Sequence, residues 1–301
     1  MGYLYLFTAV AFGLTKGFLG KKISNKTPTV RSSVMTNLVR MLFCIAVGLA
    51  FALFEIKGQI SALLVNGNVA LIALGAGAAT CVFIVSWLLS VRESAYMSVE
   101  AFIAMGVLVP TLLSALVYGE AVGASQIIGL VLLLVAVFAM SVYSGQIKGK
   151  FTFKSAALLT CTGVSAGLTD FLQKVYVNAP SGVGASTFNL YLYVFSAILL
   201  AAVLLVWKKS KADIEPGPSM DRKKLLFIAI MAVCLFCNSL FKTMAARFLP
   251  AVLLYPMCQG LALILSMLMS AFLFKERLKP VCIIGISVMF VGLLFINVIS
   301  F

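Results

Sequence analysis

The stretch from Ile127 to Tyr143 reads IIGLVLLLVAVFAMSVY, and the stretch from Val281 to Val298 reads VCIIGISVMFVGLLFINV. Both are long apolar runs without the alternation of apolar and polar residues that membrane β-strands show over about ten residues. At 1.5 Å of rise per helical residue, roughly 20 apolar residues cross the hydrocarbon core of a bilayer, which is about 30 Å thick. Because only helices and closed barrels satisfy their backbone groups in lipid, the two runs predict transmembrane helices.

The composition of the whole chain points the same way. Of the 301 residues, 62% are apolar and 11% are charged, whereas roughly a quarter of the residues in a soluble domain are charged. The mean hydropathy of +1.12 leaves too little polar surface to cover a water-soluble globule. The net charge of +14 does not indicate nucleic-acid binding, because the basic residues form short clusters between apolar runs, as in the cytoplasmic loops of membrane proteins.

Charged residues, glycines and prolines divide the chain into ten apolar runs, and each run predicts one spanning helix. The predicted limits are 2–20, 32–54, 68–91, 94–117, 123–145, 155–177, 184–207, 223–246, 249–274 and 280–299. Nearly all lysines and arginines fall in the first, third, fifth, seventh and ninth connections. By the positive-inside rule these connections are cytoplasmic, so both termini are predicted to lie outside.

Motifs recur between the two halves of the chain. Ser114–Glu120 is followed nine residues later by Gly129, and Ser270–Glu276 is followed nine residues later by Gly285, at an offset of 156 residues. Each copy leads into the last predicted helix of its half. The motif therefore marks the same place in two related units.

Two further correspondences have nearly the same offset. Gly13–Lys16 (GLTK) matches Gly167–Asp170 (GLTD) at 154 residues, and Arg92 matches Arg247 at 155 residues. Three agreeing offsets predict a tandem repeat of five helices.

We therefore expect two domains, residues 1–147 and residues 148–301, each a five-helix repeat. Because five is odd, the second repeat enters the membrane from the side opposite to the first, which gives the inverted repeat common in secondary transporters. The predicted fold is thus an all-α polytopic membrane protein with ten transmembrane helices in two inverted five-helix repeats. Two such halves can exchange conformations, which favours transport by alternating access.

The repeat resembles the EamA domain of the drug/metabolite transporter superfamily. The resemblance rests on small residues, a Gly-Glu or Lys-Glu turn and a later glycine at Pro110–Gly129 and Ser266–Gly285, and on Arg40 within Asn37–Arg40. It implies a carrier in the cell membrane that exports small metabolites such as amino acids or amphipathic compounds. Members are often drawn with cytoplasmic termini, which is the reverse of the orientation that the charges predict.

The expected partners are a small-molecule substrate and the lipid bilayer, with no nucleic acid, and the protein is expected to be a monomer or a homodimer. No cofactor and no metal ion are expected. Two other functions stay open: a flippase for a lipid-linked substrate and, less favoured, an integral membrane enzyme. The chain has no histidine, the commonest general base, and we expect no catalytic residue.

Polar residues deep in the predicted spans are the candidate substrate-binding residues, because burying them in a membrane is costly. Asp170 and Lys16 occupy equivalent positions in the two repeats, and Glu100 lies roughly two turns into the fourth helix. Lys16 could instead extend toward the headgroups, and Glu100 could form a structural ion pair with Arg40. The candidates are Asp170, Glu100, Lys16, Asn37, Arg40, Asn189, Trp87, Asn238 and Gln259. Lys242, Tyr191, Tyr193 and Tyr255 are expected to complete the lining of the site.

Other polar and small residues have structural interpretations. Glu120 and Glu276 precede the last helix of each repeat, where a carboxylate caps free N–H groups and interacts with the helix dipole, worth about 0.3–1 kcal/mol. We predict this capping role rather than proton coupling. Gly129 and Gly285 are predicted to allow close approach between helices, as are the glycines of the two spaced pairs Gly13/Gly17 and Gly163/Gly167.

Overall fold

The computed structural model describes residues 1–24, 30–57, 63–93, 96–143, 153–179, 182–206, 222–273 and 280–297. Within these ranges the protein consists of α-helices and their connections, without β-strands. The helices are α1 (Gly2–Ser24), α2 (Val30–Glu55), α3 (Gly67–Glu93), α4 (Tyr96–Met105), α5 (Leu108–Tyr118), α6 (Ala124–Tyr143), α7 (Phe153–Asn178), α8 (Ala185–Val206), α9 (Arg222–Ala245), α10 (Ala251–Leu273) and α11 (Pro280–Asn297).

Six helices in the described part of the chain are long and apolar enough to cross a membrane, namely α1, α2, α3, α7, α8 and α9. Four further apolar helical segments have 10–17 residues: Phe102–Tyr118, Ala124–Ala139, Ala251–Ser266 and Ile283–Ile296. Large apolar side chains such as Leu116 and Leu205 lie exposed on the outer surface of the bundle. Helices of this length with an apolar exterior define a multi-pass membrane protein.

Nine of the ten predicted runs correspond to single helices, but the run predicted over 94–117 is divided into α4 and α5. The helix breaks at Gly106, whose N–H is shared between the carbonyls of Phe102 and Ile103. Pro110 lies four residues further on, and a proline lacks the N–H that would bond the carbonyl four residues back and clashes with it. The prediction of one unbroken helix was therefore wrong at this position.

Close contacts between helix backbones occur at the predicted Gly129, Gly163 and Gly167, and also at Gly106, which was not predicted. A Cβ atom added at Gly106 would lie 2.1 Å from the carbonyl oxygen of Gly163, and one at Gly167 would lie 2.2 Å from the carbonyl oxygen of Gly106. Gly129 of α6 similarly faces Gly292 of α11, where an added Cβ would lie 2.5 Å from the Gly292 oxygen. The absence of a side chain at these positions lets the backbones touch.

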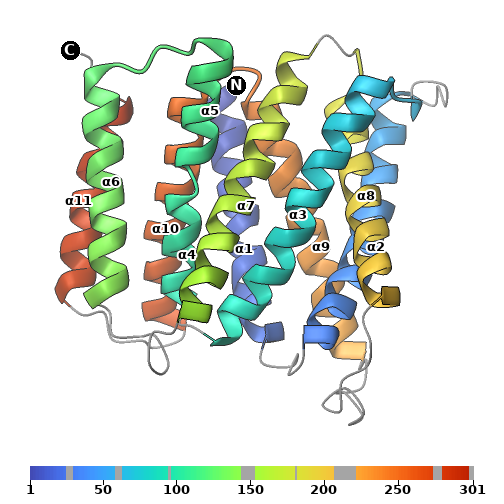
Figure 1. Cartoon of the computed structure of the whole chain (residues 1–301), viewed down its shortest axis with the longest axis horizontal. Helices are drawn as coiled ribbons and strands as arrows, with labels where there is room; N and C mark the ends of the chain where they lie inside the picture. The colour runs from blue at the N-terminus through green and yellow to red at the C-terminus, as the bar shows by residue number, and fades with distance from the viewer. Residues whose placement is uncertain are drawn as a thin grey trace.

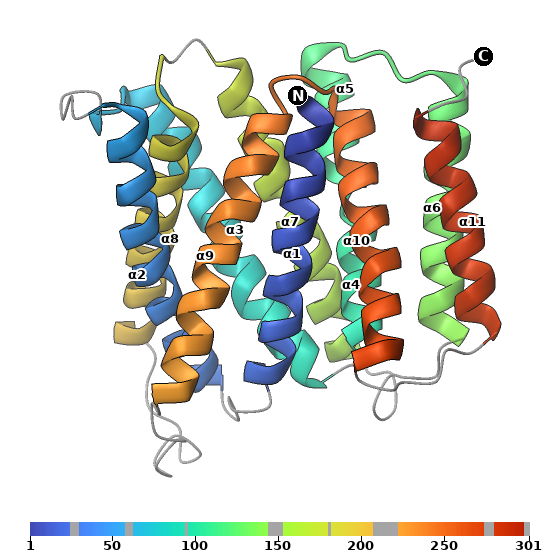
Figure 2. The same cartoon turned by 180° about the vertical axis from the view of Figure 1, so that it is seen from behind.

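The helices stand side by side in one bundle (Figures 1 and 2). The most extensive contacts pair α1 with α9, α3 with α7, α2 with α8 and α6 with α11. Each pair joins one helix from the first half of the chain to one helix from the second half. The core of the bundle is therefore made mainly of contacts between the halves.

The two ends of the bundle differ in charge. α1 begins and α11 ends at one end, which we call the terminal end (Figure 1). The helix ends that flank the Lys- and Arg-rich connections lie at the other end, which we call the basic end. Lys21 and Lys22 in the last turn of α1 belong to the basic end.

Candidate functional site

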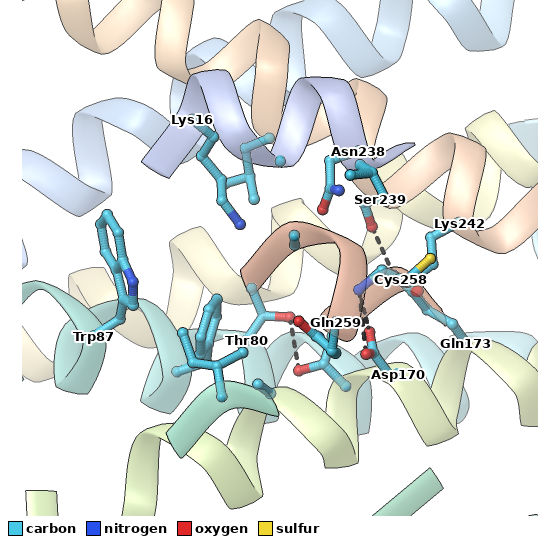
Figure 3. A pocket seen from close by; sticks show the side chains of 18 of the residues that line it. Lys16, Thr80, Trp87, Asp170, Gln173, Asn238, Ser239, Lys242, Cys258 and Gln259 are labelled. Carbon is cyan, nitrogen blue, oxygen red and sulfur yellow. Dashed lines mark hydrogen bonds and ion pairs between the residues drawn. The ribbon is translucent and has the colours of Figure 1, made fainter. Parts of the chain in front are cut away.

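A cavity of about 100 Å³ lies between helices from both halves, with walls formed by α1, α3, α4, α7, α8, α9 and α10. Six of the nine candidate residues line it. These six are Lys16, Trp87, Glu100, Asp170, Asn238 and Gln259. Figure 3 shows Lys16 and Trp87 on one side of the cavity and the side chains of Asp170 and Lys242 on the other.

An ion pair between α7 and α9 forms the second side of the cavity. The Lys242 ammonium donates to both carboxylate oxygens of Asp170, at 2.9 and 3.2 Å. The side chains of Lys242 and Asp170 are 13% and 8% exposed. Both face the cavity and are largely shielded from the exterior of the bundle. Tyr255 of α10 donates its hydroxyl to the Asp170 backbone oxygen at 2.7 Å, which ties this part of α7 to α10.

Asp170 belongs to a stripe along one side of α7. Ala166, Thr169, Asp170 and Gln173 all line the cavity, and their spacing of three and four residues places them on one helix face. The Thr169 hydroxyl lies 3.4 Å from the Thr80 hydroxyl of α3. One face of α7 thus supplies most of the polar groups on its side of the cavity.

A chain of hydrogen bonds continues from this stripe into the wall of the cavity. Gln173 donates to the Ser239 hydroxyl at 2.6 Å, and Ser239 donates to Asn189 Oδ1, also at 2.6 Å. Asn189 Nδ2 donates to the Ala185 carbonyl at 2.9 Å and to the Thr243 hydroxyl at 3.2 Å. Gln173 Oε1 is buried and has no hydrogen-bond partner.

The first half contributes the opposite wall. The Lys16 ammonium lies 5.7 Å from the centre of the Phe83 ring, a cation–π distance, so its side chain points into the cavity rather than extending toward the bilayer surface. Trp87 packs against Gly20 of α1, where an added Cβ would lie 2.1 Å from the indole ring. Asn238 donates to the Ala9 carbonyl at 2.7 Å and joins α9 to α1.

Three candidates, Asn37, Arg40 and Asn189, lie outside the cavity lining. Asn189 serves the hydrogen-bond chain described above, and Asn37 donates to the Ile84 carbonyl of α3 at 3.2 Å. The ion pair considered between Glu100 and Arg40 is not formed. Arg40 Nη1 instead donates to the Met231 sulfur at 3.7 Å, while Nε and Nη2 have no acceptor.

Two of the four residues expected to complete the lining, Tyr193 and Lys242, line the cavity, whereas Tyr191 and Tyr255 do not. The sequence prediction omitted Thr80, Thr169, Gln173, Ser239 and Cys258, which also line it. Thr169 and Gln173 share the α7 stripe with Asp170, so the helical spacing alone could have identified them. Lys242 was predicted as a lining residue because it is a charged residue inside an apolar run, which is a signal of function in a membrane helix.

A second buried ion pair lies at the terminal end. Glu120, which follows α5, accepts from the Lys174 ammonium at 3.0 Å and from the Ala251 N–H at 2.7 Å. The predicted capping role is therefore observed at the start of α10, not at the start of α6. Lys174 also donates to the carbonyls of Ala246 and Leu249, at 3.2 and 3.1 Å. We call these contacts the terminal clasp. The other predicted cap, Glu276, lies outside the described residues.

The fold and its charged central cavity define a multi-pass helical membrane protein with a polar site between its halves. Residues 153–298 match the sequence model of the EamA-like transporter family. The second half of the chain therefore belongs to the EamA-like transporter family of the drug/metabolite transporter superfamily, and the resemblance inferred from the sequence motifs is confirmed.

Twenty-nine chains of solved structures match the fold of this protein. One crystal structure matches with a TM-score of 0.73 at 14% sequence identity, covering 99% of this chain and 98% of that chain. At this identity the likeness concerns the fold alone. A sequence comparison with curated proteins finds no match.

Proposed function

We propose that the protein is a secondary transporter of ten spanning helices, arranged as two inverted five-helix repeats over residues 1–147 and 148–301. It exports a small polar metabolite across the cell membrane by alternating access. The observation that carries the proposal is the reciprocal packing of the halves. α1 packs on α9 and α3 packs on α7, so the first helix of each half contacts the third helix of the other.

The remaining main pairs fit the same symmetry. α2 with α8 and α6 with α11 each join the helices at equivalent positions of the two halves. A twofold axis in the membrane plane requires this pattern of exchanged and equivalent contacts. Because two similar halves have similar energies in exchanged conformations, the cavity between them can open to either side.

The cavity supplies the binding groups. Asp170 and Lys242 each present a charge that can interact with a polar substrate, and Lys16 presents a further ammonium group. The unpartnered Gln173 Oε1 accepts from a substrate donor. We assign these four residues to substrate binding, with Glu100, Asn238, Gln259 and Trp87 completing the walls.

Transport by the purified protein in liposomes tests the proposal, with a panel of amino acids and amphipathic cations as substrates. We expect saturable movement of at least one compound, and a loss of roughly tenfold or more in Asp170→Asn, since a charged hydrogen-bonding partner is worth about 1.5–3 kcal/mol. Ser287→Ala is the matched control, because Ser287 is on α11 and bonds only within its own helix. Retention of every compound by the wild-type liposomes would contradict the function.

The arrangement of the repeats has a separate test. Lys22 lies at the basic end of α1 and Ala179 follows α7 at the terminal end. Single cysteines at these two positions should react with a membrane-impermeant thiol reagent from opposite faces of intact membranes. Labelling of both from the same face would overturn the antiparallel arrangement.

A further inference from the structure

One face of α2 carries three polar side chains that lie outside the cavity. Ser33, Asn37 and Arg40 are 0%, 1% and 3% exposed. Their spacing of four and three residues places them on the same side of the helix. We call them the α2 strip. Ser33 Oγ, Asn37 Oδ1, Arg40 Nε and Arg40 Nη2 are all buried without a hydrogen-bond partner.

Arg40 has more buried polar atoms without a hydrogen-bond partner than the other two members of the α2 strip. A guanidinium offers five N–H donors in a planar fork that matches carboxylate or phosphate oxygens. Here Arg40 has a thioether sulfur, Met231 Sδ at 3.7 Å, as its acceptor, and thioethers are weak acceptors. A structural arginine buried this deeply would be expected to use its donors on carbonyls or on a carboxylate.

Among the described residues, no carboxylate accepts a hydrogen bond from Arg40. Cys44 and Tyr193 lie near Arg40, and their neutral forms carry no charge. Lys16 lies close enough to repel it. The Asp170 carboxylate already has Lys242 as its counter-ion. Burying a charge without a partner is strongly unfavourable, so Arg40 has an unmet requirement for an anionic partner.

The α2 strip lies beside the cavity and leads from it toward the basic end. Asn37 bonds α3, and Arg40 contacts α9, so the strip faces the space between these two helices. α2 begins at the basic end, and Ser33 lies in its first turn. The Lys- and Arg-rich connections of the basic end raise the local concentration of anions.

We propose that Arg40 is the counter-ion for an anionic group of the transported substrate, a carboxylate or a phosphate, which binds when the halves open toward the basic end. This inference rests on the proposed function and assigns a substrate class to it. In the open state α9 moves away from α2, and anion oxygens replace the Met231 sulfur as acceptors for Nε and Nη2. The Ser33 hydroxyl donates to the same anion along its path.

Binding of simple anions to the full-length protein in detergent tests the inference without requiring transport. Sodium acetate and sodium phosphate are titrated against sodium chloride at constant ionic strength, and the thermal unfolding midpoint is measured. A bound ligand raises this midpoint by mass action. We expect acetate or phosphate to stabilise the wild type, with the affinity reduced roughly tenfold or more in Arg40→Gln. Arg40→Lys should retain a weaker response, because lysine keeps the charge but not the fork.

Arg247→Gln is the matched control, since Arg247 bonds the Tyr176 hydroxyl away from the α2 strip and should leave the anion response unchanged. Without added anion, Arg40→Met should unfold at a higher temperature than the wild type, because it removes an uncompensated buried charge. A lower midpoint for Arg40→Met would indicate a structural arginine and would overturn the inference. So would equal stabilisation of wild type and Arg40→Gln, or no anion effect beyond that of chloride.

The transport assay separates the two proposals. If anion binding depends on Arg40 but no compound is transported, the anion site is supported and the proposed transport function is contradicted. If the protein transports cations or uncharged compounds but shows no response to anions, the transport function is supported and the anion site is contradicted.

Discussion

α7 carries two charged residues one turn apart, Asp170 and Lys174, and each belongs to a buried ion pair with a different character. Lys174 has three partners, the Glu120 carboxylate and two backbone carbonyls, so all three of its donors are used. Lys242, the partner of Asp170, bonds one carboxylate among the described residues and faces the cavity. A fully bonded pair resists change, whereas a pair with spare donors beside a cavity can accept a ligand.

The comparison predicts opposite consequences for stability and transport in the two pairs. The terminal clasp joins α5, α7 and the start of α10, and its members are 6% and 17% exposed. The Asp170 pair joins α7 and α9 around the cavity. Loss of the clasp should therefore mainly affect folding, and loss of the cavity pair should mainly affect binding.

The largest effect on stability is expected from Lys174→Met. The substitution leaves the Glu120 carboxylate and two carbonyls without their donor, and breaking one partner of a buried pair costs about 3–5 kcal/mol. Thermal unfolding in detergent measures the loss. Molecules that remain folded should still transport substrate, as measured per folded protein. A normal unfolding midpoint with abolished transport would place the functional charge at Lys174 instead.

The next effect concerns Asp170 and its exchange with Lys242. Asp170→Asn should reduce transport roughly tenfold or more while lowering stability less than Lys174→Met does, since the amide still accepts a hydrogen bond. The double variant Asp170→Lys with Lys242→Asp restores an ion pair. We expect it to recover stability but not transport, because the charges presented to the substrate are reversed. Recovery of both would assign the pair a structural role only.

The positions of Asp170 and Lys16 in the cavity followed from the sequence because both depend on local information. They are charged residues within apolar runs, and the repeat offset relates them to each other. The helix limits were also predictable, since hydropathy and breakers are local properties. The break at Gly106 depends on Pro110 and on contact with α7. The sequence alone does not indicate that α7 is the helix packed against Gly106.

Contacts between the halves could not be predicted residue by residue. The role of Glu120 as a cap was inferred correctly, but the chain folds so that the capped helix is α10, which begins 131 positions away at Ala251. An ion pair between Arg40 and Glu100 was one of the alternatives left open by the sequence, and the structure places Met231 beside Arg40 instead. Pairing across the bundle depends on how helices pack in three dimensions, which spacing along one helix does not specify.

A smaller effect is expected from Gln173, which connects the cavity to the hydrogen-bond chain through Ser239. Gln173→Met removes the donor to Ser239 and the unpartnered Oε1 together, so we expect a stability change of about 1 kcal/mol or less. If Oε1 contacts the substrate, the KM for transport should rise several-fold with little change in the maximal rate. Gln173→Glu keeps the acceptor and should retain more of the affinity. Equal KM values for wild type and Gln173→Met would remove Gln173 from the binding site.

The smallest effect should come from Glu55→Gln, which tests the comparison at the terminal end. Glu55 accepts from the Ser186 N–H at the start of α8 at 2.9 Å, as Glu120 does from Ala251, but its side chain is exposed and no ion pair with a described residue accompanies it. An exposed carboxylate at a helix N-terminus is worth about 0.3–1 kcal/mol, and the glutamine amide oxygen preserves the hydrogen bond. Glu120→Gln should cost several times more, because it also removes the counter-ion of a buried lysine. Equal losses in the two variants would mean that capping, rather than the Lys174 ion pair, gives the terminal clasp its strength.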